Sequence, residues 1–298
     1  MNTTRRDFLK YCGMSAATLG LTATDLLSLQ DALANPNGPS VLWLQGASCT
    51  GCSVSLLNRI SPQAPTTAAD LLINSINLVY HTNLSSAAGA TSVAALDAAY
   101  ARGGYVLAVE GGVPTAFGGA AGWLMTDSAG RDVTIAQAVK KYVSRASAVL
   151  CMGTCASWGG IPASGTNPTG IRSVGAYTGR RTINIAGCPP HPDWMAWPVV
   201  QLILGKSIAT DSYGRPTALF ARKLHDQCPL KERDEAKYWA QPNQCLKSLG
   251  CQGPETFASC PSVKWNNGVN WCVGAGAPCL GCARPSFPGQ QAFHKFPG

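Results

Sequence analysis

Short apolar runs alternate with longer stretches of mixed polarity over the first two thirds of the chain. Three of these runs lead into a glycine and a cysteine, and they read VLWLQGASC from Val41, SAVLCMGTC from Ser147 and INIAGC from Ile183. A fourth run covers residues 105–110. Apolar runs of this length that end near glycine predict buried β-strands, so three of the strands would deliver a cysteine at their carboxyl ends.

The stretches between the runs predict helices over residues 53–60, 91–102, 133–145 and 193–205. Strands that alternate with helices indicate an α/β domain with a flavodoxin-like, doubly wound parallel sheet, which we assign to residues 36–215. The ligand site of such a sheet lies outside the carboxyl ends of its strands. We therefore expect four cysteines, far apart in the sequence, to converge there. This strand-end set is Cys49, Cys52, Cys155 and Cys188.

The strand-end set offers four soft thiolates in one place, which suits a 4Fe-4S cluster or a zinc ion. The Cys49-x2-Cys52 pair alone would fit a redox disulfide or a zinc knuckle. Cys151 lies inside an apolar run, so we expect it to pack as a small hydrophobic residue, and its use as a ligand in place of Cys155 is the alternative. A nucleotide site is not indicated, because no GxGxxG or Walker A motif opens a helix.

Residues 225–282, within the last part of the chain (216–298), show neither a helical nor a strand period, and Gly, Pro, Asn and Gln are frequent among them. Side chains alone are not expected to supply a core there, so disulfides, zinc or iron-sulfur clusters would hold the segment together. Its potential ligands fall into two groups. The His225 set is His225, Cys228, Cys245 and Cys251, and the Cys260 set is Cys260, Cys272, Cys279 and Cys282. Charged neighbours place the His225 set near the surface, whereas we expect the Cys260 set to be buried.

The N-terminus has the features of an export signal rather than of a folded element. Arg5 and Arg6 precede a weakly apolar run, and Ala32-Leu33-Ala34 fits the small-residue rule for cleavage. This pattern predicts a twin-arginine signal peptide over residues 1–34, export of the folded protein with its cofactors, and a periplasmic location. No second apolar run approaches 18 residues, so we expect no membrane span in the mature chain.

Composition restricts the class of protein and of partner. The chain has 298 residues, of which 46% are hydrophobic, so we expect one core with a smaller appended domain. Only 13% of the residues are charged, which predicts a surface of loops or contact regions, and an obligate partner is one explanation. The formal net charge is +8. Two four-thiolate clusters and one with three thiolates and a histidine would lower it to roughly +3, so we predict no nucleic-acid partner.

Two structural alternatives to iron-sulfur clusters follow from the cysteines. Loss of Cys12 with the signal leaves twelve of the 13 cysteines, which could pair as disulfides in an oxidising compartment. A zinc-bearing structural or interaction module would fit the CxxC pairs. Two observations argue against the disulfide and zinc alternatives. A chain of this length needs no cross-links to form a stable core. Twin-arginine export carries proteins that are already folded and loaded with cofactors.

The ligand motifs together resemble the small, electron-transferring subunit of periplasmic nickel-iron hydrogenases. The motifs are VLWLQGASCTGCSVSLLN, GTCASWGGIPA, GCPPHPDW, H-x2-CP, LGC-x-GPET and WNNGVNWCV followed by PCLGC, within residues 41–288. Their wording is most similar to the nickel-iron-selenium subgroup. A subunit of a quinone-reducing complex could share the first domain, but it would lack the motifs of the last quarter.

The resemblance implies three iron-sulfur clusters and no catalytic residue in this chain. The strand-end set would bind a proximal 4Fe-4S cluster, the His225 set a distal 4Fe-4S cluster and the Cys260 set a medial cluster. Many members have proline where this chain has Cys272, and their medial cluster is 3Fe-4S; here the extra thiolate predicts a medial 4Fe-4S cluster, with 3Fe-4S as the alternative. The C-terminal iron-sulfur domain, residues 216–298, would have little regular secondary structure.

The resemblance also implies the reaction and the partners. The chain would relay electrons during reversible H2 oxidation between the nickel-iron site of a large subunit and an external carrier, such as a c-type cytochrome, that docks near His225.

Two departures from the family pattern matter. Gly51 and Gly160 stand where oxygen-tolerant members have extra cysteines, so tolerance by that device is not expected, and Ser48 replaces a frequent glutamate.

Overall fold

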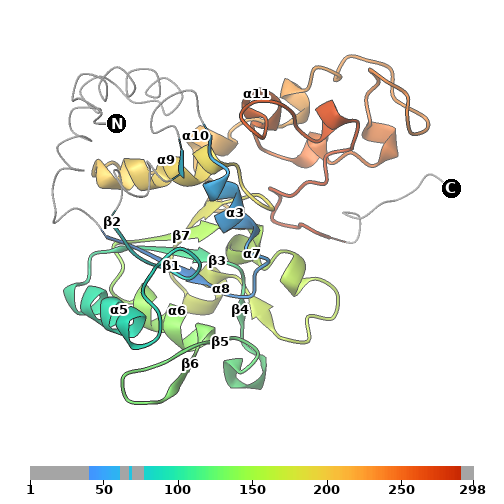
Figure 1. The fold of residues 1–298 in the computed structure, drawn as a ribbon. Helices are drawn as coiled ribbons and strands as arrows, with labels where there is room; N and C mark the ends of the chain where they lie inside the picture. The colour runs from blue at the N-terminus through green and yellow to red at the C-terminus, as the bar shows by residue number, and fades with distance from the viewer. Residues whose placement is uncertain (1–39, 61–66, 69–76, 290–298) are drawn as a thin grey trace, which may run out of the picture.

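The computed structural model describes residues 40–60, 67–68 and 77–289 (Figure 1). The predicted signal peptide over residues 1–34 lies outside the described residues, as does Cys12. Among the described residues, no helix has both the length and the apolar character needed to cross a membrane.

A five-stranded sheet forms the centre of the first part of the chain, in the order β2-β1-β3-β7-β9. Its strands are β1 (Ser40–Gln45), β2 (Asn77–His81), β3 (Val106–Glu110), β7 (Ala148–Met152) and β9 (Ile183–Ile185). All neighbouring strands are parallel. The order is that of a flavodoxin-like doubly wound sheet, so the predicted fold class is confirmed.

The four predicted helices are present, with ends that differ from the prediction by at most three residues. They are α3 (Gly51–Leu57), α5 (Ala90–Arg102), α6 (Ile135–Val143) and α9 (Pro192–Ile203). Helix α6 starts where it does because Thr134 and Gln137 form a capping box, in which each side chain accepts a hydrogen bond from the other residue's backbone N–H. The remaining helices of this part are short: α7 (Gly153–Trp158), α8 (Val174–Thr178), η1 (Ala116–Gly119) and η2 (Ile161–Ala163).

Sequence reasoning missed one strand of the main sheet and two small antiparallel pairs. Strand β2 lies at the sheet edge and is only partly buried, so its sequence lacks the continuous apolar run that marks the central strands. The small pairs join β4 (Val113–Pro114) to β8 (Ile171–Arg172) and β5 (Trp123–Thr126) to β6 (Asp132–Thr134). Strands of two to four residues are too short to show a period.

The two faces of the sheet pack into two hydrophobic clusters, because successive side chains of a strand point to opposite faces. Leu42, Leu44 and Leu107 belong to the cluster that includes buried residues of α5 and α6. Val41 and Trp43 belong to the other cluster, which includes α9. Figure 1 shows the same division, with α3 and α9 on one side of the sheet and α5 and α6 on the other.

The last part of the chain has little regular structure, as predicted. Its elements are α10 (Thr217–Phe220), α11 (Cys260–Val263), η3 (His225–Gln227), η4 (Lys247–Leu249), η5 (Gly253–Glu255) and η6 (Val273–Ala275). It is nevertheless packed: Leu224, Leu249 and Trp271 are buried in the same cluster as Val41 and α9. Side chains on both sides of residue 215 therefore share one core, which the absence of a period did not predict, and the division into domains at 215/216 stays a prediction.

Candidate metal centres

The strand-end set lies at the edge where the carboxyl ends of β1, β7 and β9 meet. Cys49 follows β1 and Cys52 is in the first turn of α3, whereas Cys155 lies in α7, directly after β7, and Cys188 follows β9. The four thiols lie close enough to interact electrostatically. Negative charges at Cys49 and Cys188 act on the Cys52 thiol, and those at Cys49 and Cys52 act on the Cys155 thiol. Cys155 and Cys188 also share a hydrogen bond between their thiols.

Glycine allows the backbone to approach these thiols closely. A Cβ at Gly153 would lie 2.5 Å from the Cys52 sulfur, and one at Gly160 would lie 2.9 Å from the Cys155 sulfur. Both glycines have positive φ angles, 87° and 54°, which L-residues rarely adopt. Any side chain at either position would occupy the space around the sulfurs.

The charge balance of the strand-end set favours a bound cation. Burial, with the negative charges of Glu110, Cys188 and Cys49, raises the pKa of Cys52 well above its usual range. The hydrogen bond shared with Cys155, together with burial, likewise raises the pKa of Cys188. Several thiolates cannot coexist there without a compensating positive charge, and a metal centre supplies that charge when it deprotonates its ligands. The donor set therefore fits a thiolate-ligated metal cluster.

The His225 set gathers around two short turns. A Cβ at Gly253 would lie 3.4 Å from the Cys251 sulfur and 3.8 Å from the Cβ of His225, so these two ligands are neighbours. Negative charges at Cys228 and Cys245 act on the Cys251 thiol, so these thiols also lie close together. His225 and Cys228 are partly exposed, and the nearby Lys231 and Arg233 are exposed. His225 and Cys228 therefore lie near the surface, as predicted for the set, whereas Cys245 is buried.

The Cys260 set also forms one group, but it is not buried throughout. Negative charges at Cys282, Cys279 and Cys272 all act on the Cys260 thiol, so the four thiols lie close together. Burial raises the pKa of Cys279 to about 12 and that of Cys282 to about 11. Cys272, however, is exposed, and the expectation that all four residues are buried is wrong for it. The reason is local: its neighbours Trp271 and Val273 both pack into the core, which leaves the residue between them at the surface.

The Cys260 set lies between the other two sets, and backbone groups connect it to both. The backbone N–H of Cys188 donates to the Cys282 thiol, and that of Cys279 donates to the sulfur of Cys251 at 3.3 Å. The buried hydroxyl of Thr154 adds a second link to the strand-end set, because it donates to the carbonyl of Cys282 at 2.5 Å and accepts from the N–H of Gly187 at 3.0 Å.

Cys151 stands apart from the three sets. It is fully buried in β7 within the core cluster of α5 and α6, and burial raises its pKa to about 12. Its packing as a small hydrophobic residue is confirmed.

Sequence reasoning missed a buried carboxylate beside the strand-end set. Glu110 ends β3, is inaccessible to solvent, and accepts hydrogen bonds from the backbone N–H groups of Cys52 and Ser53 at 3.0 and 3.3 Å. The signal was present in the sequence: a charged residue closes an otherwise apolar strand, at the end of the sheet where ligands bind.

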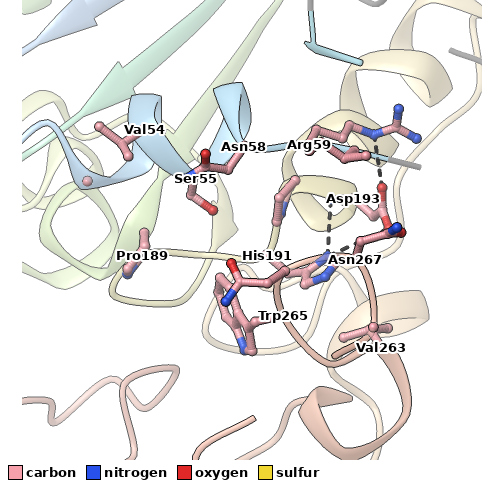
Figure 2. A pocket seen from close by; sticks show the side chains of 15 residues that line it. Val54, Ser55, Asn58, Arg59, Pro189, His191, Asp193, Val263, Trp265 and Asn267 are labelled. Carbon is pink, nitrogen blue, oxygen red and sulfur yellow. Dashed lines mark hydrogen bonds and ion pairs between the residues drawn. The ribbon is translucent and has the colours of Figure 1, made fainter. Parts of the chain in front are cut away.

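A hollow of about 410 Å³ adjoins the strand-end set through Gly51 and Pro189. Figure 2 shows that it lies between the α3 segment, the start of α9 and the loop that carries Trp265 and Asn267. Arg59 donates to the carboxylate of Asp193 at 3.0 Å on one side. Three apolar side chains of the α3 segment are exposed nearby: Val54, Leu57 and Ile60.

The structure gives no support to either structural alternative. All twelve cysteines among the described residues are free of disulfides. In the same part of the chain, no group of three or more His, Cys, Asp or Glu side chains is arranged to hold a metal ion. A zinc ion needs its four ligands within about 2.3 Å of one point, whereas the ligands of a four-iron cluster bind different irons and lie farther apart.

Known protein families match both parts of the chain. The family described as NADH ubiquinone oxidoreductase, 20 Kd subunit, matches residues 49–202. The family that represents the C-terminal part of the NiFe/NiFeSe hydrogenase small subunit matches residues 220–295. The first match alone would also suit the quinone-reducing alternative. The second covers the His225 and Cys260 sets, which that alternative lacks.

Similar proteins cover nearly the whole chain. The periplasmic [NiFe] hydrogenase small subunit of Solidesulfovibrio fructosivorans is 37% identical over 95% of this chain and 90% of its own length. The periplasmic [NiFeSe] hydrogenase small subunit of Desulfomicrobium baculatum is 34% identical over 99% of each. A solved structure of the [NiFeSe] hydrogenase from Desulfovibrio vulgaris Hildenborough has a TM-score of 0.79 and 34% identity, with 87% of this chain and 97% of that chain covered. The chain therefore belongs to the family of NiFe/NiFeSe hydrogenase small subunits, the electron-transfer subunits of H2 oxidoreductases.

Proposed function

We propose that this protein relays electrons through three 4Fe-4S clusters held by the strand-end, Cys260 and His225 sets, in that spatial order. When bound, such clusters accept and release one electron at a time. The observation that carries the proposal is the pair of backbone links described above, from Cys188 to Cys282 and from Cys279 to Cys251. They join the Cys260 set to both neighbours, and the strand-end set has no such link to the His225 set within the described residues.

The ligands that we propose are the twelve residues of the three sets, with Cys272 as the fourth ligand of the medial cluster. Its thiol lies close enough to influence those of Cys260 and Cys282. His225 would make its ligand set one negative charge smaller than the others. This difference, together with the exposure of the His225 set, would distinguish the potential of the last cluster from those of the first two.

The partners that we propose follow from the two ends of this path. Small subunits of this family pair with a large hydrogenase subunit, and we place the partner's nickel-iron site over the strand-end set. The hollow beside Gly51 and the exposed apolar side chains of the α3 segment support a protein contact at this face. A c-type cytochrome or a similar carrier would dock near His225. Export by the twin-arginine route to the periplasm fits the two relatives described above, which are named as periplasmic.

The test is the metal content of the purified complex with its large subunit. We expect a brown protein with broad visible absorption, about four irons per ligand set, and cluster signals in electron paramagnetic resonance (EPR). Cys260→Ser should remove or convert one cluster. Cys151→Ala is the matched control, because it changes a buried cysteine outside the three sets and should leave the iron content unchanged. A colourless complex that contains no iron would refute the proposal.

A further inference from the structure

Glu110 is a buried charge that none of the three ligand sets uses. Its carboxylate accepts five hydrogen bonds: from the backbone N–H groups of Cys52 and Ser53, from the hydroxyls of Ser48 and Ser53, and from the indole of Trp43. The shortest, from the Ser53 hydroxyl, spans 2.5 Å. Five donors that converge on two oxygens are the environment of an ionised carboxylate, which is acceptor-only.

The donors are neutral, so they hold the negative charge without cancelling it. Beyond the Ser53 hydroxyl lies one further titratable group, His81, which is fully buried. Its Nδ1 accepts the backbone N–H of Asn83 at 3.1 Å, so its Nε2 carries the hydrogen and donates to the Ser53 hydroxyl at 3.3 Å. Burial lowers the pKa of His81 to about 4, which keeps the ring neutral. No Lys or Arg of the described residues forms an ion pair with Glu110.

One oxygen of the Glu110 carboxylate is hydrogen-bonded to the backbone of a proposed ligand. Oε1 of Glu110 accepts a hydrogen bond from the N–H of Cys52, at the start of α3. The negative charge of Glu110 also contributes to the raised pKa of the Cys52 thiol. Ser48, which donates to the same oxygen, also accepts the N–H of Thr50 and so closes the turn between Cys49 and Cys52. The Glu110 side chain therefore both helps to fix the turn, through Ser48 and Cys52, and places a negative charge beside the Cys52 thiol.

We propose that Glu110 is a positioning residue for the strand-end centre that also lowers its reduction potential, by holding a permanent negative charge beside it. The proposal rests on the proposed function, because it requires a redox cluster at the strand-end set. Adding an electron makes a cluster more negative, so a fixed carboxylate disfavours the reduced form. A unit charge within about 10 Å, in an interior of effective dielectric constant about 20, shifts the ratio of reduced to oxidised centre by about tenfold or more.

The experiment is a redox titration of the complex with its large subunit, followed by EPR. Glu110→Gln keeps the shape of the side chain and removes its charge, so the strand-end centre should become easier to reduce by about tenfold, which is about 59 mV for one electron. Glu110→Asp keeps the charge and should restore most of the low potential. An unchanged midpoint potential in Glu110→Gln with full iron content, or equal shifts in both variants, would overturn the proposal.

A second variant covers the case in which Glu110→Gln loses its cluster. Trp43→Phe removes one neutral donor and leaves the charge of Glu110 in place on its four remaining donors, so the strand-end centre should keep its low potential. A positive shift of about tenfold in Trp43→Phe with full iron content would show that packing around Glu110 rather than its charge sets the potential, and would overturn the proposal. Absence of iron from the unmodified complex would instead refute the proposed function, so the two failures are distinguishable.

Discussion

Protonation of His81 should destabilise the folded chain at mildly acidic pH. The imidazole is fully buried against Trp43, with a distance of 4.9 Å between the ring centroids, and burial lowers its pKa from 6.5 to about 4. The unfolded chain therefore binds this proton more readily than the folded chain does. Stability from this group is complete above pH 6.5 and is lost as the pH falls from 6.5 through 4.

The magnitude follows from the separation of the two pKa values. At pH 5 the unfolded imidazole is almost fully protonated and the folded one is mostly neutral, which lowers the free energy of unfolding by about 2 kcal/mol relative to pH 7. Below pH 4 the loss reaches about 3 kcal/mol, because each pKa unit is worth about 1.36 kcal/mol. For a chain of this size, about 2 kcal/mol corresponds to a decrease in Tm of roughly 4 to 8 °C.

The assay compares thermal unfolding of the complex at pH 7 and pH 5 for the unmodified chain and for His81→Gln. The glutamine amide can still donate to the Ser53 hydroxyl but does not titrate. Other ionisable groups contribute equally to both proteins, so the difference between the two pH effects isolates His81. Equal decreases in Tm between pH 7 and pH 5 for both proteins would refute the reasoning.

Three further substitutions test the metal centres and the core. Cys272→Pro should remove about one iron and produce a new 3Fe-4S signal in EPR after oxidation; without that signal, Cys272 is not a ligand. Thr154→Val keeps the volume but leaves two buried backbone groups unpaired, so it should lower the free energy of unfolding by about 1 to 3 kcal/mol, and no loss in denaturation would contradict the link. Leu150→Ala in the buried central strand should cost about 2 to 5 kcal/mol. Its control, Val269→Ala, changes a side chain that is 74% exposed and should stay within about 0.5 kcal/mol.

The sequence was most informative where one local pattern determines a position in three dimensions. An apolar run that ends in glycine and cysteine predicts a strand and the location of the cysteine together, because parallel strands place their carboxyl ends at the same edge. The convergence of Cys49, Cys155 and Cys188 could therefore be predicted without any long-range information.

Features that depend on contacts between distant segments could not be predicted in this way. The carboxylate of Glu110 is held by residues on β1, α3 and the turn between them, and only the fold brings these donors together. The exposure of Cys272 depends on where its two neighbours pack. The links of Cys282 to Cys188 and of Cys279 to Cys251 join segments without a periodic pattern, so the spacing of the motifs carried no information about which ligand sets adjoin.

The spatial order of the three ligand sets has a consequence for biosynthesis. The set that lies in the middle in space comes last in the sequence, since Cys279 and Cys282 follow all the ligands of the other two sets. In the relay that we propose, a growing chain would therefore complete both ends of the electron path before its centre exists. The proposed path would become continuous only when nearly the whole polypeptide has left the ribosome, so a chain truncated before Cys279 would lack the connection between its two ends.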